Sequence, residues 1–176
     1  SSTERTALKA GDVWWEGDLF SGRPNWNKLL AIPKSTLTIE ERDFIDNETE
    51  TLCKMLDDWK IVQEDCDLTS ETWKFIKEKG FFALAIEKKY GGKGFSAYGH
   101  STIVSKIAAR SISAAVNIMV PNSLGPAELL SHYGTEKQKK HYLPKLATGE
   151  EVPCFALTST QAGSDAGAME DIGIIC

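Results

Sequence analysis

The stretch of this sequence best suited to chemistry is residues 155–165, which read Phe-Ala-Leu-Thr-Ser-Thr-Gln-Ala-Gly-Ser-Asp. A strand-like apolar run ends there at the hydroxyl residue Thr158, and a turn containing Gly163 and Ser164 follows. Backbone N–H groups and hydroxyls in such a turn can donate hydrogen bonds to a phosphate or to the edge of a heterocycle. Glycine lets a flat ring approach the backbone closely. Residue types alone favour the simpler interpretation, an ordinary hairpin loop.

A second glycine-rich segment, Tyr90-Gly91-Gly92-Lys93-Gly94, is better interpreted as a tight turn than as a nucleotide cradle. It lacks the G-x-x-x-x-G-K-[ST] pattern and the strand-to-helix context of a phosphate-binding loop. Lys137, Lys139 and Lys140 lie on one predicted helix, and a charge run of this kind is typical of a solvated helix face.

The sequence gives little support for a metal site or for a catalytic nucleophile. No C-x-x-C spacing is present, and no set of cysteines and histidines matches a zinc pattern. The spacing suggests no acid–base partner for any histidine, so Ser-His-Asp chemistry cannot be argued. The residues concerned are Cys53, Cys66, Cys154, Cys176, His100, His132 and His141. We therefore expect no metal, and reduced cysteines of the cytosolic type.

Length and charge limit the class of protein. The 176 residues correspond to roughly one domain and part of another. A net charge of −5 without a basic stripe argues against general nucleic-acid binding. No apolar run is long enough for a transmembrane helix, and no signal-peptide pattern is present. Because the sequence lacks an initial Met and ends in the strand-like Ile172–Cys176, we expect it to be an excerpt of a longer protein.

Hydrophobic periodicity predicts helices up to about residue 150 and strands after it. The first helix starts at a capping box formed by Thr38 and Glu41 and should fade near residues 63–67. Its buried stripe comprises Ile45, Leu52, Leu56 and Trp59. Further helices are predicted over 69–80, from Ser96 or Ser101 through Ala108, over 113–133 with an interruption at 121–126, and over 135–149 with Tyr142 and Leu143 inward. A second capping box, formed by Thr135 and Gln138, should start the last of these helices. Gly80 and Gly149 should end their helices. The predicted strands are 152–158 and 172–176.

Residues 1–36 show no sustained periodicity and form a predicted irregular extension that contains Trp14, Trp15 and Trp26. Packing of these aromatics on the helical body is the favoured interpretation. The alternative is an interfacial anchor, because tryptophan favours membrane boundaries. Residues 1–50 carry ten acidic and six basic groups, which weakens that alternative.

An ordered series of residues resembles the acyl-CoA dehydrogenase family. The series is Tyr133-Gly134-Thr135, Gln138-Lys139, Tyr142-Leu143-Pro144, Gly149, Cys154 to Thr158, and Ala162 to Asp165, with the 90–94 turn upstream. Residues 11–20, 95–98 and 120–126 are similar to the bacterial membrane-associated members that act in fatty-acid β-oxidation. The fold class that this resemblance implies is mainly α. A helical-bundle domain (37–150) follows the extension (1–36) and precedes the first strands of a middle β domain (151–176).

The resemblance implies a flavoprotein that oxidises fatty acyl-CoA to trans-2-enoyl-CoA. The implied FAD contacts are Phe155, Ala156, Leu157, Thr158, Gly163 and Ser164, with Ser164 also touching the substrate. The family commonly has Glu-Pro where this chain has Ser159-Thr160, a difference that backbone contacts should survive. The resemblance places the catalytic glutamate in a later helical domain, so no catalytic residue is assigned here and the 176 residues alone are expected to be inactive.

The resemblance also implies partners and a location. An electron-transfer flavoprotein would accept the electrons, a homo-oligomer is one possible assembly, and the cytoplasmic face of the bacterial inner membrane is the expected location if an anchor precedes Ser1. Two other functions stay open. One is an acyl-CoA oxidase or a nitroalkane-oxidase-like flavoenzyme on the same fold. The other is a helical interaction module without catalysis.

Overall fold

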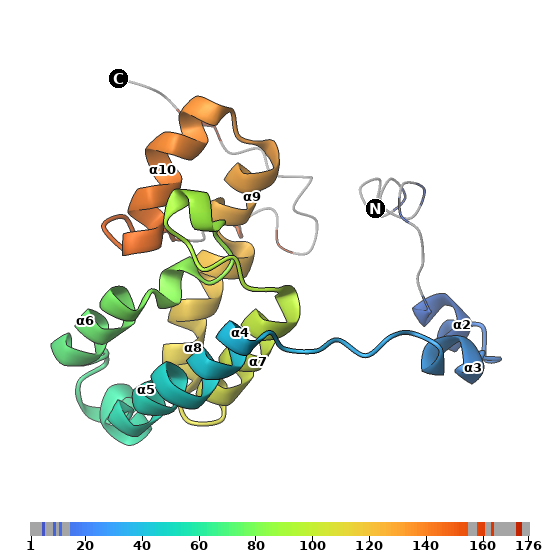
Figure 1. Ribbon diagram of the computed structural model, residues 1–176, viewed down its shortest axis with the longest axis horizontal. Helices are drawn as coiled ribbons and strands as arrows, with labels where there is room; N and C mark the ends of the chain where they lie inside the picture. Colours follow the sequence, from blue (N-terminus) through green and yellow to red (C-terminus); the bar gives the residue numbers. More distant parts are fainter. Residues whose placement is uncertain are drawn as a thin grey trace. The chain divides into compact units, whose positions relative to one another are not determined.

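Helices account for the regular secondary structure of the described residues (Figure 1). The computed structural model describes residues 5, 9, 11, 15–154, 158–160, 163 and 172–173. The chain forms two units, residues 35–155, and residues 1–34 together with 156–176. The helices of the first unit are α4 (Ile39–Phe44), α5 (Glu50–Met55), α6 (Ser70–Lys79), α7 (Ala97–Ala108), α8 (Ile112–Met119), α9 (Pro126–Tyr133) and α10 (Glu136–Thr148). Its π-helical turns are η1 (Ile45–Thr49), η2 (Lys60–Glu64) and η5 (Val120–Leu124), and its 3₁₀ turns are η3 (Phe81–Ala83) and η4 (Lys88–Tyr90).

The helix boundaries follow from local capping chemistry. Thr38 and Thr135 each accept a hydrogen bond from the backbone N–H three residues on, and the side chains of Glu41 and Gln138 return the interaction, so both predicted capping boxes form. Ser96, not Ser101, caps α7. Glycine ends α6 and α10, where Gly80 (φ 75°) and Gly149 (φ 69°) take the left-handed conformation.

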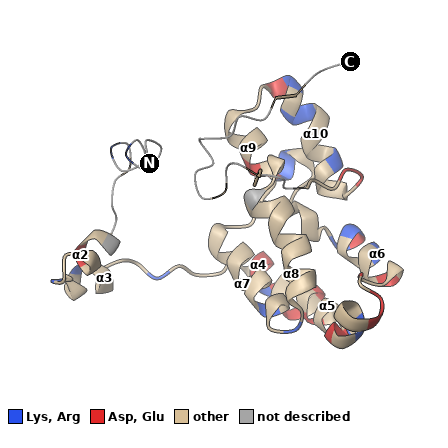
Figure 2. Ribbon diagram, turned by 180° about the vertical axis from the view of Figure 1, so that it is seen from behind, with Lys and Arg blue, Asp and Glu red and all other residues tan. Residues whose placement is uncertain are grey.

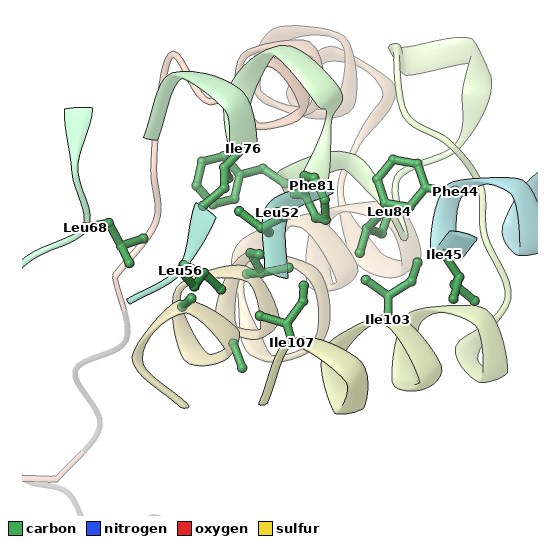
Figure 3. Close-up of a cluster of buried hydrophobic side chains, with 14 of the residues drawn as sticks. Phe44, Ile45, Leu52, Leu56, Leu68, Ile76, Phe81, Leu84, Ile103 and Ile107 are labelled. Atoms are coloured by element: carbon green, nitrogen blue, oxygen red, sulfur yellow. The ribbon is translucent and has the colours of Figure 1, made fainter. Parts of the chain in front are cut away.

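The main core collects the inward faces of α4, α5, α6, α7 and α8 (Figure 3). Its centre is Leu52, Ile76, Phe81, Leu84, Ile103, Ile107 and Ile118, each buried. Phe44 packs against Phe81 with ring centroids 4.9 Å apart. Burying side chains of this size contributes about 1.5–3 kcal/mol each. This core packs α7 against α8 and thereby fixes the position of α8.

The first helix is shorter than its periodicity predicts. It ends at Met55, because Leu56 adopts extended backbone with ψ of 117°. The backbone N–H of Lys60 then donates to the carboxylate of Asp57 at 3.2 Å, which starts a new turn. Leu56 stays in the core, but Trp59 is 70% exposed, so its prediction as a buried residue is wrong. Because the extended backbone at Leu56 ends the helix, residues seven positions apart across it, such as Leu52 and Trp59, no longer lie on the same helix face.

A smaller core joins α9 and α10 to the 83–90 loop. Leu143 is fully buried there, while Tyr142 is 41% exposed, so only half of the predicted inner pair is correct. Adjacent helix positions differ by about 100° in direction, and Leu146 and Ala147 share the face of Leu143 instead. The phenol of Tyr90 donates to Glu136 at 3.1 Å and links the loop to the start of α10.

Residues 15–34 contain two short helices, α2 (Glu16–Phe20) and α3 (Trp26–Leu30). Trp15 is buried, its indole N–H donates to the carbonyl of Asn25 at 3.0 Å, and its ring lies 5.1 Å from that of Trp26. The Asn25 side chain caps α3. Trp15 therefore stabilises this part of the predicted irregular extension, through contacts with residues of the same segment. Packing of the extension on the helical unit stays a prediction.

The described residues after 150 carry no strand. Val152–Cys154, Thr158–Thr160 and Ile172–Gly173 have irregular backbone, and a strand requires a paired neighbour to form a ladder. The rest of the two predicted strands, 155–157 and 174–176, lies outside the described residues, where the strands stay a prediction.

Candidate functional site

The outer face of α8 exposes apolar side chains. Ala114, Ala115 and Ile118 face the core and are buried. On the opposite side, Ile112 is 65% and Val116 45% exposed. The polar residues Ser113 and Asn117 also lie on this side, half-buried and exposed respectively, so the apolar part is a strip along the helix and not its whole outer face. We call Ile112, Val116 and the half-buried Met119 and Val120 the outer α8 stripe.

Sequence reasoning missed the outer α8 stripe, although a signal was present. No charged residue occurs from Ser111 to Ala127, and α8 is accordingly tan in Figure 2, whereas a helix on a protein surface usually alternates apolar and charged positions. The spacing of four between Ile112, Val116 and Val120 places them along one line of the helix. Such a line offers a long, narrow, apolar contact, suited to an unbranched hydrocarbon.

Asn122 fixes the position of the turn that follows the stripe. The residue is 2% exposed, and its amide donates to the carbonyls of Phe81 (2.7 Å) and Ile118 (2.9 Å). Its side-chain oxygen accepts from the N–H of Ala85 at 3.1 Å. One buried side chain therefore satisfies three backbone groups and ties η5 to the 81–86 segment.

The glycine-rich 90–94 segment is a tight turn, as predicted. Gly91 (φ 87°) and Gly94 (φ 61°) are left-handed, and a Cβ on Gly92 would collide with the carbonyl of Ile86. The N–H groups of Lys93 and Gly94 donate to the carbonyls of Ala83 and Ile86, each at 2.8 Å. These donors are already used within the protein, so they are not available to cradle a phosphate.

The buried carboxylate of Glu41 has a structural role. It is 1% exposed and accepts hydrogen bonds from the backbone N–H groups of Thr38 (2.8 Å) and Ser96 (2.6 Å), which start α4 and α7. Burial alone would raise the pKa of Glu41, but the hydrogen bonds from Ser96 and Thr38 outweigh it and lower the pKa. A Cβ on Gly99 would collide with the same carboxylate. An ionised, fully bonded carboxylate of this kind is not a general base.

A cavity of about 360 Å³ with both apolar and polar lining lies where α7, η5 and α9 meet, and its polar side chains include Ser96, His100, Asn122, Glu128 and His132. The Nε2 atom of His100 is buried and finds no hydrogen-bond partner among the described residues. Burial lowers the pKa of His100, and the nearby charge of Glu128 opposes that shift. His100 is therefore neutral near pH 7, and the cavity has room for water at its ring.

Most of the flavin-contact residues implied by the resemblance lie outside the described residues: Phe155, Ala156, Leu157 and Ser164. Thr158 and Gly163 are described and exposed. Among the described residues, no atom lies within 4 Å of the position a Cβ on Gly163 would take, apart from the glycine itself and its chain neighbours. An exposed hydroxyl and an open glycine fit a segment that approaches a flat ring, and their role as contacts stays a prediction.

The remaining sequence predictions concern the lysines of α10, the cysteines, metal ligands and membrane-spanning helices. Lys137 and Lys140 are exposed, as predicted for a solvated face. The Lys139 side chain is only 15% exposed, and its ammonium lies 3.7 Å from the carboxylate of Glu136, so the prediction is wrong for this residue. Cys53, Cys66 and Cys154 are free thiols, and Cys176 lies outside the described residues. Within the described part of the chain, no three His, Cys, Asp or Glu side chains gather as metal ligands do. None of the described helices is long and apolar enough to cross a bilayer.

Comparison with known proteins places this helical unit among enzymes. The family profile described as "Acyl-CoA dehydrogenase, N-terminal domain" matches residues 37–150. The chain is 27% identical over 170 residues to the human mitochondrial very long-chain specific acyl-CoA dehydrogenase, covering 95% of this chain and 26% of the relative. It is 35% identical over 133 residues to the CarC subunit of the caffeyl-CoA reductase-Etf complex of Acetobacterium woodii, covering 76% of this chain and 34% of that subunit.

A solved structure supports the same grouping. The acyl-CoA dehydrogenase from Bacillus anthracis, solved in complex with FAD, is 30% identical with a TM-score of 0.55, over 74% of this chain and 21% of that one. The chain thus spans between about a quarter and a third of the length of the two relatives named above.

Proposed function

From the premise that this chain belongs to the acyl-CoA dehydrogenase family, whose N-terminal domain it carries, we propose that it serves an FAD-dependent enzyme that converts fatty acyl-CoA to trans-2-enoyl-CoA. Residues 37–150 are the helical domain, 1–36 an extension and 151–176 the start of a middle β domain. Fatty-acid β-oxidation is the proposed process. The cytoplasmic face of a bacterial inner membrane is the proposed location.

The observation that carries this proposal is the outer α8 stripe. An acyl chain laid along Ile112, Val116 and Val120 would cover Ile112 and Val116, which the helix leaves exposed. Each buried methylene contributes about 0.8 kcal/mol, so a short stripe is enough to select for a hydrocarbon tail. The helix thereby forms one wall of the acyl pocket, and the core behind Ala114 and Ile118 keeps that wall rigid.

The proposed cofactor segment is residues 155–164. FAD, when bound, supplies the acceptor for the β-hydride of the thioester. Thr158 would donate its hydroxyl to the ring edge, and Gly163 would let the ring approach the backbone. Phe155, Ala156, Leu157 and Ser164 complete the proposed contact set, and Ser164 also meets the acyl-CoA.

No catalytic base is proposed among the 176 residues. The reaction removes the proton α to a thioester carbonyl, which requires a carboxylate beside the substrate and a site closed to water. Glu41 is held by two backbone N–H groups in the interior and cannot serve. The contribution of this chain is therefore to bind and orient the acyl tail and to exclude water from it.

The proposed electron acceptor is an electron-transfer flavoprotein. Support comes from the CarC relative, which is a subunit of a complex with Etf. That relative also favours a second candidate function, the reverse reaction, in which an enoyl-CoA is reduced. The helical wall would serve either direction, because the same tail occupies it before and after the reaction.

The test uses the full-length protein that contains this chain. Anaerobic addition of a long-chain acyl-CoA should bleach the flavin absorbance, and electrons should then pass to an electron-transfer flavoprotein. In a separate aerobic assay the same substrate should cause no rapid oxygen consumption. Rapid oxygen consumption would indicate an oxidase, and reduction of enoyl-CoA with a reduced Etf would indicate the reductase. Absence of bound flavin would refute the proposal and leave a helical interaction module.

A further inference from the structure

The cavity where α7, η5 and α9 meet, which we call the His100 cavity, presents hydrogen-bond acceptors because the donors around it are used within the protein. Ser123 and Ser131 donate their hydroxyl protons to backbone carbonyls four residues earlier, at 2.9 and 2.7 Å. Both N–H bonds of the Asn122 amide are used in the same way. Ser96 accepts from a backbone N–H at 3.0 Å, and its side chain bonds to Glu41. The oxygens of Ser123 and Ser131 can therefore only accept a bond from a molecule in the cavity.

Two further acceptors at the His100 cavity have no hydrogen-bond partner among the described residues. One is the buried Nε2 atom of His100, which accepts when the neutral ring carries its proton on Nδ1. The other is the carboxylate of Glu128, which is exposed and forms no ion pair with a described residue. The charge of Glu128 acts on the imidazole, since it opposes the effect of burial on the pKa of His100. An unsatisfied acceptor inside and an uncompensated negative charge at the open side therefore belong to one space.

The rest of the lining suits a small organic molecule with a positive charge. In the described part of the chain, no lysine or arginine lines the His100 cavity, and His132 is its only other titratable group. Phe95 and three alanines supply apolar surface; the alanines are Ala85, Ala97 and Ala127. The volume of about 360 Å³ lies within the range of about 300–1,000 Å³ that is common for small-molecule pockets.

We propose that the His100 cavity binds a small organic cation, a primary ammonium group on a short apolar body. An ammonium group has three N–H donors and no acceptor, which matches His100 Nε2, the Glu128 carboxylate and a serine oxygen. The apolar body packs against Phe95 and the alanines. Water would satisfy the same acceptors but would leave the charge of Glu128 uncompensated. A metal ion fits less well, because no three His, Cys, Asp or Glu side chains gather as ligands in the described part of the chain.

This proposal goes beyond the proposed enzymatic function and does not depend on it, because none of the outer α8 stripe residues lines the cavity. The bound cation would connect two helices, since His100 lies on α7 and Glu128 on α9. A ligand that binds only the folded state stabilises it by mass action. Occupancy should therefore raise the melting temperature of the protein.

The experiment is isothermal titration calorimetry on the full-length protein that contains this chain. The probe is benzylamine, which is protonated near pH 7, and benzyl alcohol is its neutral counterpart of nearly the same shape. Benzylamine should bind about tenfold or more tightly than benzyl alcohol, because only the ammonium makes charge-assisted bonds. Equal affinity for the two, or no binding of either, would overturn the proposal. Binding of Zn²⁺ that displaces benzylamine and is lost in Glu128→Gln would assign the cavity to a metal ion and also overturn it.

The charge of Glu128 is tested by Glu128→Gln. This variant should bind benzylamine up to about fivefold more weakly, since Glu128 is exposed and its attraction is partly screened. Because the side chain is exposed, the substitution should leave the melting temperature without ligand unchanged. Glu64→Gln is the matched control, at an exposed glutamate of η2 outside the cavity, and it should bind as the wild type does. An equal loss in the two variants would contradict the assignment.

The inner acceptor is tested by His100→Phe and His100→Gln. His100→Phe keeps an aromatic ring but removes Nε2, and it should weaken benzylamine binding about tenfold or more, whereas the exposed control His141→Phe should not. His100→Gln supplies an acceptor that does not titrate. Glu128 and His132 face the cavity in both proteins, so the difference between them reports His100. Near pH 7 the His100→Gln variant should bind as the wild type does, but only the wild type should lose affinity at about pH 5.5, where an imidazole takes up a proton. The same loss in both proteins would contradict a contact with His100.

Discussion

Replacing Glu41 with glutamine should destabilise the helical unit more than any other single charge removal in α4. The carboxylate accepts from the N–H groups of Thr38 and Ser96 at 2.8 and 2.6 Å while 1% exposed. Glutamine keeps one acceptor oxygen but turns an NH₂ group toward the other N–H. The variant therefore loses one charge-assisted bond and leaves a buried donor unsatisfied, a cost of about 2–3 kcal/mol. That is a large part of the typical stability of a domain.

Urea unfolding followed by circular dichroism measures this cost, and Glu40→Gln provides the control. Glu40 pairs with Lys88 at 2.6 Å, but both side chains are nearly two-thirds exposed, so its removal should cost under about 1 kcal/mol. Equal destabilisation by the two variants would refute the structural role of Glu41.

The same pair of variants gives a pH dependence. The hydrogen bonds from Ser96 and Thr38 lower the pKa of Glu41 against the opposing effect of burial, whereas the unfolded chain has an ordinary pKa of about 4.3. The stabilisation is complete above that value and is lost as the pH falls through the lower folded pKa. The difference between wild type and Glu41→Gln should thus shrink below about pH 4, and a difference that grows there would contradict the assignment.

Three further substitutions and one control, Asn117→Ala, test the packing, each by urea unfolding. Gly92→Ala should cost more than about 2 kcal/mol or prevent folding, because the new Cβ collides with the carbonyl of Ile86. Asn122→Ala should cost about 2–4 kcal/mol, since three backbone groups lose their partner. Asn117→Ala, at an exposed position with one local bond, should cost well under half of that. Trp59→Ala should cost under about 1 kcal/mol, because the ring is 70% exposed, and a larger loss would show that Trp59 is a core residue as its spacing predicts.

Sequence patterns identified the parts of this fold that local chemistry determines. The capping boxes at Thr38 and Thr135 and the glycine stops at Gly80 and Gly149 involve only neighbouring residues, and all four occur as predicted. The prediction that Trp59 is buried was wrong because the extended backbone at Leu56 ends the helix before it. Hydrophobic periodicity does not predict such a break.

The candidate site was less visible in the sequence. In the sequence the outer α8 stripe is indistinguishable from core residues. The exposure of Ile112 and Val116 shows that the described chain leaves these two side chains uncovered. The role of Glu41 depends on Ser96, which lies 55 residues away. Such a contact is a property of the tertiary fold, and helix patterns cannot predict it.

The central claim is that the outer α8 stripe contacts the acyl chain, and chain-length kinetics test it most directly. In the full-length enzyme, Val116→Trp should lower kcat/KM for long acyl-CoA substrates about tenfold or more, since excluding two methylenes costs about 1.6 kcal/mol. Short acyl-CoA substrates should be affected much less. Leu129→Trp, at a 60% exposed position on α9, should leave both unchanged. An unaltered long-chain kcat/KM in Val116→Trp would contradict the account.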